Sequence, residues 1–317
     1  MRLESRVALS RAVVLGIALA GAAAGAAAQV AAPLPPSSLA WQEGGRWVEW
    51  WSAARAPARW DSAGAILARR VPWLRSASGV EWGEVALAGS GEAWRTRVIA
   101  VRIDPQRVRI SLDTAFVRGR AAWTLDHADT AALVAFNAGQ FSTTMPWGWV
   151  VLGGRDFLSS ASAPLAATII VTTGGAVHWS SGRAIPSVPR EQVAWAFQSY
   201  PLLLSEGDVP RPLREAGLGV DVAHRDARLA LGVSWNGELI VALTRFDAIG
   251  PAFDRVPFGL TAPEMAAVMG ALGARNATLL DGGISAQLLV RGAAGEHRWP
   301  GSRAVPLALV VHTAPTR

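Results

Sequence analysis

The stretch TAPEMAAVMGALGARNATLLDGGIS, residues 261–285, carries the clearest structural pattern in the chain. Thr261 and Glu264 have the spacing of a capping box, and Pro263 falls in the first helical turn, where proline is tolerated. Apolar side chains at helical spacing follow, and Gly273 is placed to end the helix. The pattern therefore predicts one well-defined helix that begins at the capping box.

The helix leads into a strand, predicted at residues 277–280, which runs out into Asp281-Gly282-Gly283. A carboxylate at the end of a buried strand, next to glycines that let the backbone approach a ligand closely, is typical of a functional site. Asp-Gly is also a common turn, so the spacing alone leaves both interpretations open.

A second strand with a polar end is predicted upstream, where residues 131–136 run into Asn137-Ala138-Gly139. The amide of Asn137 offers a donor and an acceptor, which suits sugar hydroxyls or a phosphate oxygen. An Asx-turn would use the same residue, and the sequence does not separate the two. Asn137 and Gly139 are candidate ligand contacts.

Two arginines mark the ends of a pair of strands predicted at residues 228–235 and 239–245. The Asn-Gly pair at residues 236–237 predicts a two-residue type I′ hairpin turn between them. Alternation places Arg228 on one face above two small residues, which suggests the floor of a pocket. Arg228 and Arg245 on neighbouring strands could hold an anionic oxyacid, although each alone is more often a salt-bridged edge residue.

The rest of the chain after residue 80 also has the alternating or β-branched runs of strands. Further strands are predicted at residues 85–87, 96–103, 108–112, 167–172, 193–197 and 305–312. Before them, Trp47, Trp50 and Trp51 have helical spacing, which predicts one or two packing helices, although clustered tryptophans could also form a sugar-stacking platform. The expected fold class is α+β, a strand-rich mixed sheet with few helices.

The N-terminal segment has the pattern of a secretory signal peptide. Three arginines precede an alanine-rich apolar run at residues 12–24, and three alanines at residues 26–28 offer a cleavage site. We therefore divide the chain into a signal peptide at 1–28, a Pro/Ser linker with a Trp/Arg-rich extension at 29–79, and one domain at 80–313. The apolar run is short and weakly hydrophobic for an anchor. A periplasmic or secreted protein with no stable membrane span after cleavage is expected.

Composition excludes several kinds of site. The 317 residues include no cysteine, which excludes disulfides, a thiol nucleophile and cysteine-ligated metals, and no lysine, which excludes a Schiff base or P-loop lysine. The five histidines lack metal-binding spacing, so no cofactor is expected, although Asp247, Asp254 or Asp281 could supply oxygen ligands to a divalent cation. A formal charge of +6 without a basic run or an aromatic-flanked arginine cluster predicts no nucleic-acid partner.

The motifs follow one another in a fixed order. In chain order they are Asn-x-Gly-x-Phe (137–141), Pro-x-Gly (146–148), Pro-Leu-Leu (201–203), Arg-x-Ala-Leu-Gly (228–232), a lone arginine (245), Gly-Leu-Thr-x-x-Glu (259–264) and Leu-Asp-Gly-Gly-x-Ser (280–285). Over about residues 80–312, this order resembles the phosphodiester glycosidase family. The resemblance implies a pocket lined by Asn137, Gly139, Arg228, Arg245, Asp281, Gly282, Gly283 and Ser285. The chain departs from the family pattern at Ala138, Gln140, Leu229, Ile284 and Ala286.

The resemblance implies hydrolysis of a sugar-1-phosphodiester at the glycosidic bond, with a glycosyl phosphodiester or phosphorylated glycan as ligand. The site must then stabilise charge on the departing phosphate and direct a carboxylate at the developing oxocarbenium ion. Arg228 and Arg245 are the candidates for the phosphate, and Asp281 is the candidate base or nucleophile. Asn137 completes the catalytic set and, with Ser285, would position oxygens. Two alternatives stay open: a phosphodiesterase or transferase that acts on exported polysaccharide, and a non-catalytic glycan-binding protein on the same fold.

Overall fold

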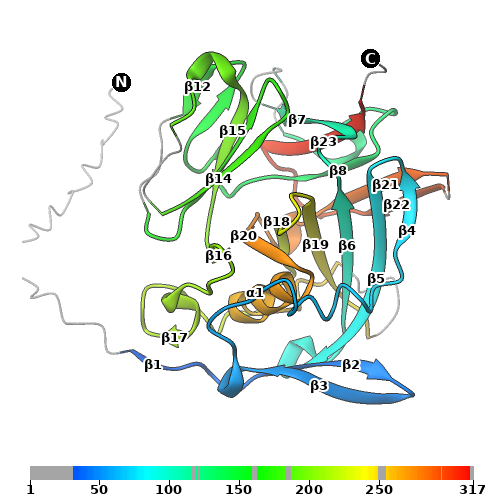
Figure 1. The fold of residues 1–317 in the computed structure, drawn as a ribbon, viewed down its shortest axis with the longest axis vertical. Coiled ribbons are helices and arrows are strands. Elements are labelled where there is room, and N and C mark those ends of the chain that lie inside the picture. The colour runs from blue at the N-terminus through cyan, green and yellow to red at the C-terminus, as the bar shows by residue number, and fades with distance from the viewer. Residues whose placement is uncertain are drawn as a thin grey trace, which may run out of the picture.

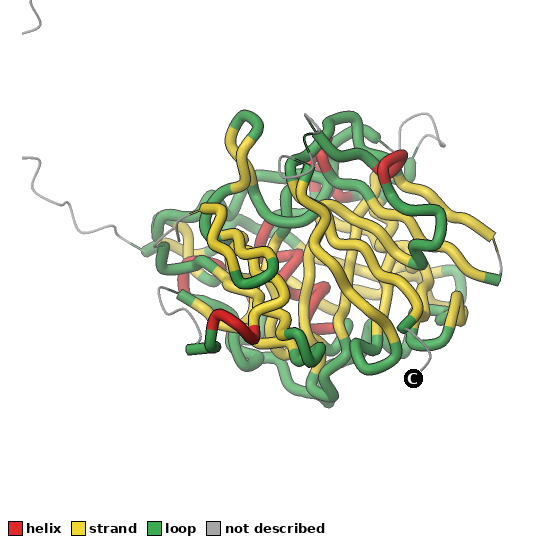
Figure 2. The backbone as a smooth tube through the Cα atoms, turned by 90° about the horizontal axis from the view of Figure 1, so that it is seen from above, coloured by secondary structure: helices red, strands yellow, loops and turns green. Residues whose placement is uncertain are grey.

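The computed structural model describes residues 31–115, 119, 122–158, 163–182, 187–248, 255–293 and 295–314. The predicted signal peptide lies outside the described residues. Strands dominate the chain (Figure 2) and divide among several sheets. No helix in these ranges combines the length and the apolar composition that a bilayer crossing requires.

The central sheet has nine strands, and each pairing within it is antiparallel. Its strands, in spatial order, are β16 (Leu202–Leu204), β20 (Ala274–Leu279), β18 (Leu229–Ser234), β19 (Leu239–Phe246), β6 (Thr96–Ile103), β5 (Val80–Gly89), β2 (Ser38–Glu43) and β3 (Arg46–Ser52), with β4 (Leu74–Ala77) paired to β5. Strands from both ends of the chain therefore meet in one sheet.

Two smaller sheets pack near the central one (Figure 1). One has the order β22 (Gly295–Trp299), β21 (Leu288–Gly292), β8 (Val134–Asn137), β23 (Leu307–Thr313) and β7 (Val108–Thr114). The other has the order β12 (Arg155–Leu158), β11 (Val150–Leu152), β15 (Val193–Ser199), β13 (Ala167–Thr172) and β14 (Val177–Ser181). Two-stranded ladders join β1 (Ala32–Pro33) to β17 (Glu215–Ala216) and β9 (Phe141–Ser142) to β10 (Met145–Pro146).

Alternation along β18 explains the two apolar cores. Leu229 and Leu231 point to one face of the central sheet, where they join a core shared with the two smaller sheets. Ala230 points to the other face and joins a core with β2 and with the helix α1 (Ala262–Ala271). Because both faces of the central sheet are covered at β18 and β19, every residue of these two strands is buried, and β19 begins with an unbroken apolar run at residues 239–243.

The helix α1 confirms the capping-box prediction. The Thr261 N–H donates to Glu264 Oε2 (2.8 Å), and the Glu264 N–H donates to Thr261 Oγ1 (3.3 Å). The apolar spacing predicts one buried face, but all residues of α1 are buried, because the segment around Trp60 covers the side away from the sheet. Gly270 has no Cβ, which allows the Trp60 ring to lie directly on the helix. With α1 as the single α-helix among the described residues, the strand-rich α+β prediction is confirmed.

The helix predicted around Trp47, Trp50 and Trp51 is wrong. These residues belong to β3, which forms a hairpin with β2 across Gly44 and Gly45. Both glycines have positive φ (55° and 80°), the conformation that a tight hairpin turn requires. Aromatic residues favour strands, and the Gly-Gly pair is the signal that identifies the hairpin. Residues 38–77, assigned to the extension, supply β2, β3 and β4 of the central sheet.

The predicted type I′ turn between β18 and β19 is also wrong. Gly237 has a positive φ of 90°, but Asn236 is not among the described residues with positive φ, which both central positions of a type I′ turn require. The Ser234 N–H donates to the Glu238 carbonyl (2.8 Å), which closes a three-residue loop. The loop is one residue longer than predicted, and the register of the hairpin shifts accordingly.

Candidate active site

Asp281 lies just beyond the end of β20. The Leu280 N–H donates to the Leu229 carbonyl (2.8 Å), which extends the pairing with β18 up to the residue before Asp281. The Asn137 side chain, at the end of β8, donates through Nδ2 to the Asp281 carbonyl (2.8 Å). Two strand ends from different sheets therefore fix the backbone of Asp281.

Gly282 and Gly283 allow the segment from residue 226 to lie against this loop. A Cβ at Gly282 would lie 2.7 Å from the Ala227 carbonyl oxygen, and the Gly283 N–H donates to that same oxygen (2.7 Å). Gly283 has a φ of 58°, and a Cβ there would lie 2.8 Å from Asp226 Oδ2. Larger residues would displace both contacts, so the glycines bring the carboxyl of Asp226 next to the loop that carries Asp281.

Burial raises the pKa of Asp281 to about 6, well above the ordinary aspartate value. A hydrogen bond from Ser285 and the positive charge of Arg303 lower this pKa, whereas the negative charge of Asp226 raises it. The carboxyl is thus poised to change protonation state near neutral pH. A pKa in that range suits a general base, and it distinguishes Asp281 from an exposed turn residue.

Asp226 is a second acidic residue at this site, and it belongs to none of the sequence motifs. Burial raises its pKa, while Arg228 and His224 act in the opposite direction. His224 Nε2 lies 3.7 Å from Asp226 Oδ2, and the Ala227 N–H donates to Asp226 Oδ1 (2.9 Å). Its position two residues before Arg228, at the start of a strand, is the signal that could have identified it.

Arg228 lies beside Asp226 and is held by the backbone. Its Nε donates to the Leu260 carbonyl (2.7 Å), and one terminal nitrogen donates to the His224 carbonyl (2.6 Å). Burial lowers the pKa of Arg228, and the neighbouring Asp226 raises it. The guanidinium of Arg228 therefore supplies a fixed positive charge next to the carboxyl of Asp226.

Arg245 points to the opposite face of the central sheet. Leu229 pairs with Leu243, so Arg228 lies opposite Thr244, and alternation directs Arg245 to the other side. The side chain of Arg245 is only 2% exposed, and one terminal nitrogen donates to the carbonyls of Ala286 (2.6 Å), Trp299 and Pro300 (both 3.2 Å). The structure thus separates Arg228 from Arg245, although both lie near the loop that follows Asp281.

Asn137 and Gly139 lie behind the loop. Asn137 is fully buried, and its Oδ1 accepts from the Gln287 N–H (2.9 Å), so both ends of its amide bind backbone groups. Gly139 has a φ of 30°, and a Cβ there would lie 3.1 Å from the Gln198 carbonyl oxygen. Asn137 therefore holds the backbone around Asp281, and Gly139 lets the chain pass close to Gln198.

Arg303 is a positively charged side chain near Asp281 that lies outside every sequence motif. It is exposed, its guanidinium carbon lies 4.7 Å from the centre of the Phe141 ring, and its charge lowers the pKa of Asp281. The Arg303 N–H donates to the Ile284 carbonyl (3.1 Å), which ties it to the turn after Asp281. The sequence around it, Arg-x-x-Pro at residues 303–306, matches no motif that would predict a position near Asp281.

A buried ion pair supports the segment before Arg228. The two terminal nitrogens of Arg225 donate to the two carboxylate oxygens of Glu264 (2.7 and 2.8 Å). Glu264 Oε2 also accepts the N–H of Thr261, so one carboxylate caps α1 and anchors residue 225. The capping box predicted the bond to Thr261, and the ion pair with Arg225 is an additional role of Glu264.

Metal ligands do not cluster in the described part of the chain, where no three acidic or histidine side chains are placed to hold a cation. Asp247, one of the carboxylates considered from the sequence, lies 3.9 Å from Arg97 Nε as an ion pair. Asp254 lies outside the described residues.

Solved structures show a similar fold. The catalytic domain of zebrafish N-acetylglucosamine-1-phosphodiester alpha-N-acetylglucosaminidase, auto-inhibited by its pro-peptide, matches with a TM-score of 0.57 and 17% identity, over 81% of this chain and 96% of that chain. A hypothetical protein from Synechocystis matches with a TM-score of 0.47 and 17% identity, over 77% of this chain and 64% of that chain. No curated protein matches the sequence.

The sequence itself matches the phosphodiester glycosidase family over residues 130–312. This range covers more than half of the chain and includes β8, β18, β19, α1 and the loop of Asp281. The chain therefore belongs to the phosphodiester glycosidase family.

Proposed function

We propose that this protein is an exported hydrolase that cleaves a sugar-1-phosphodiester at the glycosidic bond. The observation that carries the proposal is the half-buried carboxyl of Asp281, with a pKa of about 6, held within the electrostatic reach of Arg303 and beside two glycines. Glycosidases use carboxylates at the anomeric carbon, and a phosphate leaving group needs a nearby cation.

In the proposed reaction Asp281 faces the anomeric carbon, either as the base that activates water or as the nucleophile that bonds to that carbon. As a base, the carboxylate removes a proton from water while the water oxygen bonds to the anomeric carbon. The bond from that carbon to the phosphate oxygen breaks, and its electron pair leaves with the phosphate monoester. The phosphate needs no general acid, so the cations carry the stabilisation of the leaving group.

We assign the phosphate to Arg303 and Arg228. The Arg303 guanidinium is exposed and forms no ion pair or hydrogen bond to any described residue, so its donors are free for a ligand. Arg228 lies behind Asp226 and adds positive charge. The sequence paired Arg228 with Arg245, but the contacts of Arg245 favour a positioning role, as do those of Asn137.

The test is hydrolysis of a synthetic sugar-1-phosphodiester in ¹⁸O-labelled water. We expect the label in the sugar, because the proposal breaks the carbon–oxygen bond. Label in the phosphate would mean attack at phosphorus and a phosphodiesterase or transferase. Tight binding without turnover at any pH would mean a glycan-binding protein.

Removal of divalent cations is a separate test. Because the proposal gives the phosphate charge to arginines, we expect turnover to be unchanged in the presence of EDTA.

The pH dependence provides a second test. Because burial raises the pKa of Asp281 to about 6, the reactive carboxylate form is lost as the pH falls through that value. We expect kcat/KM to decrease below about pH 6 and to be constant from there towards neutral pH. Arg303 lowers this pKa, so Arg303→Ala should move the acid limb to higher pH. A limb that does not move with Arg303 would assign it to another group.

The same proposal covers location and partners. The signal-peptide pattern at residues 1–28 supports a periplasmic or secreted protein, and the ligand would be a glycosyl phosphodiester or phosphorylated glycan. The absence of a basic run in the sequence argues against a nucleic-acid partner.

A further inference from the structure

A groove lies at the end of the central sheet remote from Asp281. Two adjoining hollows of about 350 and 290 Å³ share Arg102 and Glu238 as lining residues. Asp281 lies near Leu229, at the start of β18, whereas the groove begins at Trp235, just past the end of that strand. At about 3.4 Å per residue, β18 separates the two places by roughly 20 Å. The groove is therefore distinct from the candidate active site.

The floor of the groove is a row of cross-strand partners. Arg75 on β4 pairs with Glu81 on β5, Glu81 with Arg102 on β6, and Arg102 with Ile240 on β19. Direct partners in antiparallel strands share a face of the sheet. The floor thus alternates in charge across three strands and becomes apolar at the fourth.

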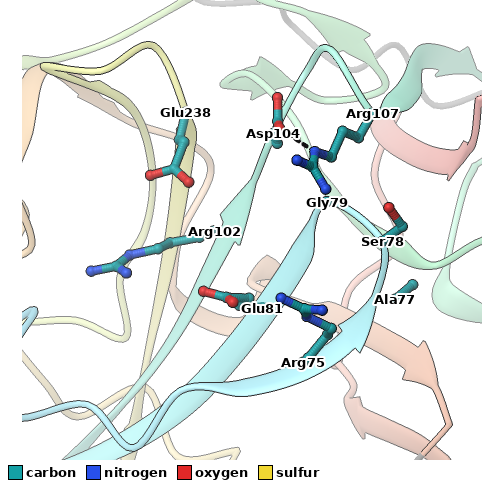
Figure 3. A pocket seen from close by; sticks show the side chains of 9 residues that line it. All are labelled: Arg75, Ala77, Ser78, Gly79, Glu81, Arg102, Asp104, Arg107 and Glu238. Carbon is teal, nitrogen blue, oxygen red and sulfur yellow. Dashed lines mark ion pairs between the residues drawn. The ribbon is translucent and has the colours of Figure 1, made fainter.

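The charged heads in this row have few partners of their own (Figure 3). No ion pair joins Arg75, Glu81 or Arg102 to another of the side chains drawn. These three side chains form no ion pair or hydrogen bond with any other described residue, and the guanidinium carbon of Arg102 lies 3.9 Å from the centre of the Trp73 ring. Glu238 accepts one hydrogen bond from Asn236 (3.1 Å). The first hollow therefore presents unused donors and acceptors side by side, with no excess of either charge.

Trp235 forms one wall of the second hollow. Its side chain is 36% exposed, and a Cβ at Gly207 would lie 3.1 Å from its Cζ2 atom, so the ring packs closely at one edge while the rest reaches solvent. Ile240 and Leu272 line the same hollow. An aromatic ring next to aliphatic side chains suits the apolar face of a pyranose ring.

We propose that this groove binds a neutral stretch of a glycan chain. Sugar hydroxyls both donate and accept hydrogen bonds, which matches the adjoining arginines and carboxylates. The balance of charges gives no preference to an anion. Trp235 would stack on one sugar ring, while Arg102 and Glu238, shared by the two hollows, would bind the hydroxyls of the next.

The test is isothermal titration calorimetry of the mature protein with cellohexaose, chitohexaose and maltohexaose. We expect at least one of these neutral chains to bind with a Kd below about 1 mM. Trp235→Ala and Arg102→Ala should each weaken that binding tenfold or more. Trp47→Ala is the matched control, because Trp47 is 37% exposed, close to the 36% of Trp235, but lies on the β2–β3 hairpin.

Three results would overturn the proposal. None of the three neutral chains binds; only an anionic chain such as a heparin hexasaccharide binds; or Trp47→Ala weakens binding as much as Trp235→Ala does. Thermal unfolding of each variant confirms that the fold is intact. Because the readout is binding and not turnover, its failure leaves the proposed hydrolysis untouched, and the reverse also holds.

Discussion

Replacement of Asp281 by asparagine is expected to lower kcat on a glycosyl phosphodiester by about 10²–10⁴-fold. The amide has nearly the same size as the carboxyl, but it cannot accept the proton of water or face a developing positive charge with a negative one. Burial disfavours the charged form of Asp281 in the native protein, as its raised pKa shows. Removing the charge should therefore leave the fold as stable as before or slightly more stable.

Steady-state kinetics and thermal unfolding check this expectation together. Asp208→Asn is the control, because it makes the same chemical change at an exposed carboxylate that pairs with Arg59 on the surface (2.9 Å). The control should keep near-normal kcat. Retention of most of the turnover by Asp281→Asn would exclude Asp281 as base and as nucleophile.

Replacement of Arg245 by methionine is expected to reduce the free energy of unfolding by about 3 kcal/mol or more. Methionine fills much of the space but leaves the carbonyls of Ala286, Trp299 and Pro300 without their donor. Each buried acceptor left unpaired costs about 1–3 kcal/mol. Native proteins are stable by only about 5–15 kcal/mol, so the effect is a large share of the total.

Urea unfolding of Arg245→Met, compared with Arg59→Met, separates a positioning role from phosphate binding. Arg59 forms an exposed ion pair, which typically contributes less than about 1 kcal/mol. A variant at Arg245 with native stability and a raised KM would show that this guanidinium binds the substrate after all.

The sequence predicted those parts of the fold that depend on local chemistry. Strands of β-branched residues such as β6 and β13 were found at their true bounds, because alternation and apolar runs are local signals. The helix α1 followed from its cap, whereas the place of Asp281 after a strand and before two glycines fitted a turn as well as a site residue.

What could not be predicted depends on register. With a two-residue turn, Arg228 and Arg245 would have been direct partners on one face; the three-residue loop moves Arg245 to the other face. One residue in a turn thus decides which arginine reaches the site. Arg303 reaches the site through contacts between distant segments, which no local pattern records, whereas Asp226 had a local signal in its position just before Arg228.

The central sheet also bears on where the chain can be cut. The stretch that matches the family begins at residue 130, but β19 within it pairs along eight residues with β6, which precedes that stretch. Taken alone, the matching stretch would leave β19 as an unpaired sheet edge. A fragment that begins at residue 130 is therefore expected to aggregate through this edge, because the strand β6 that covers it would be missing.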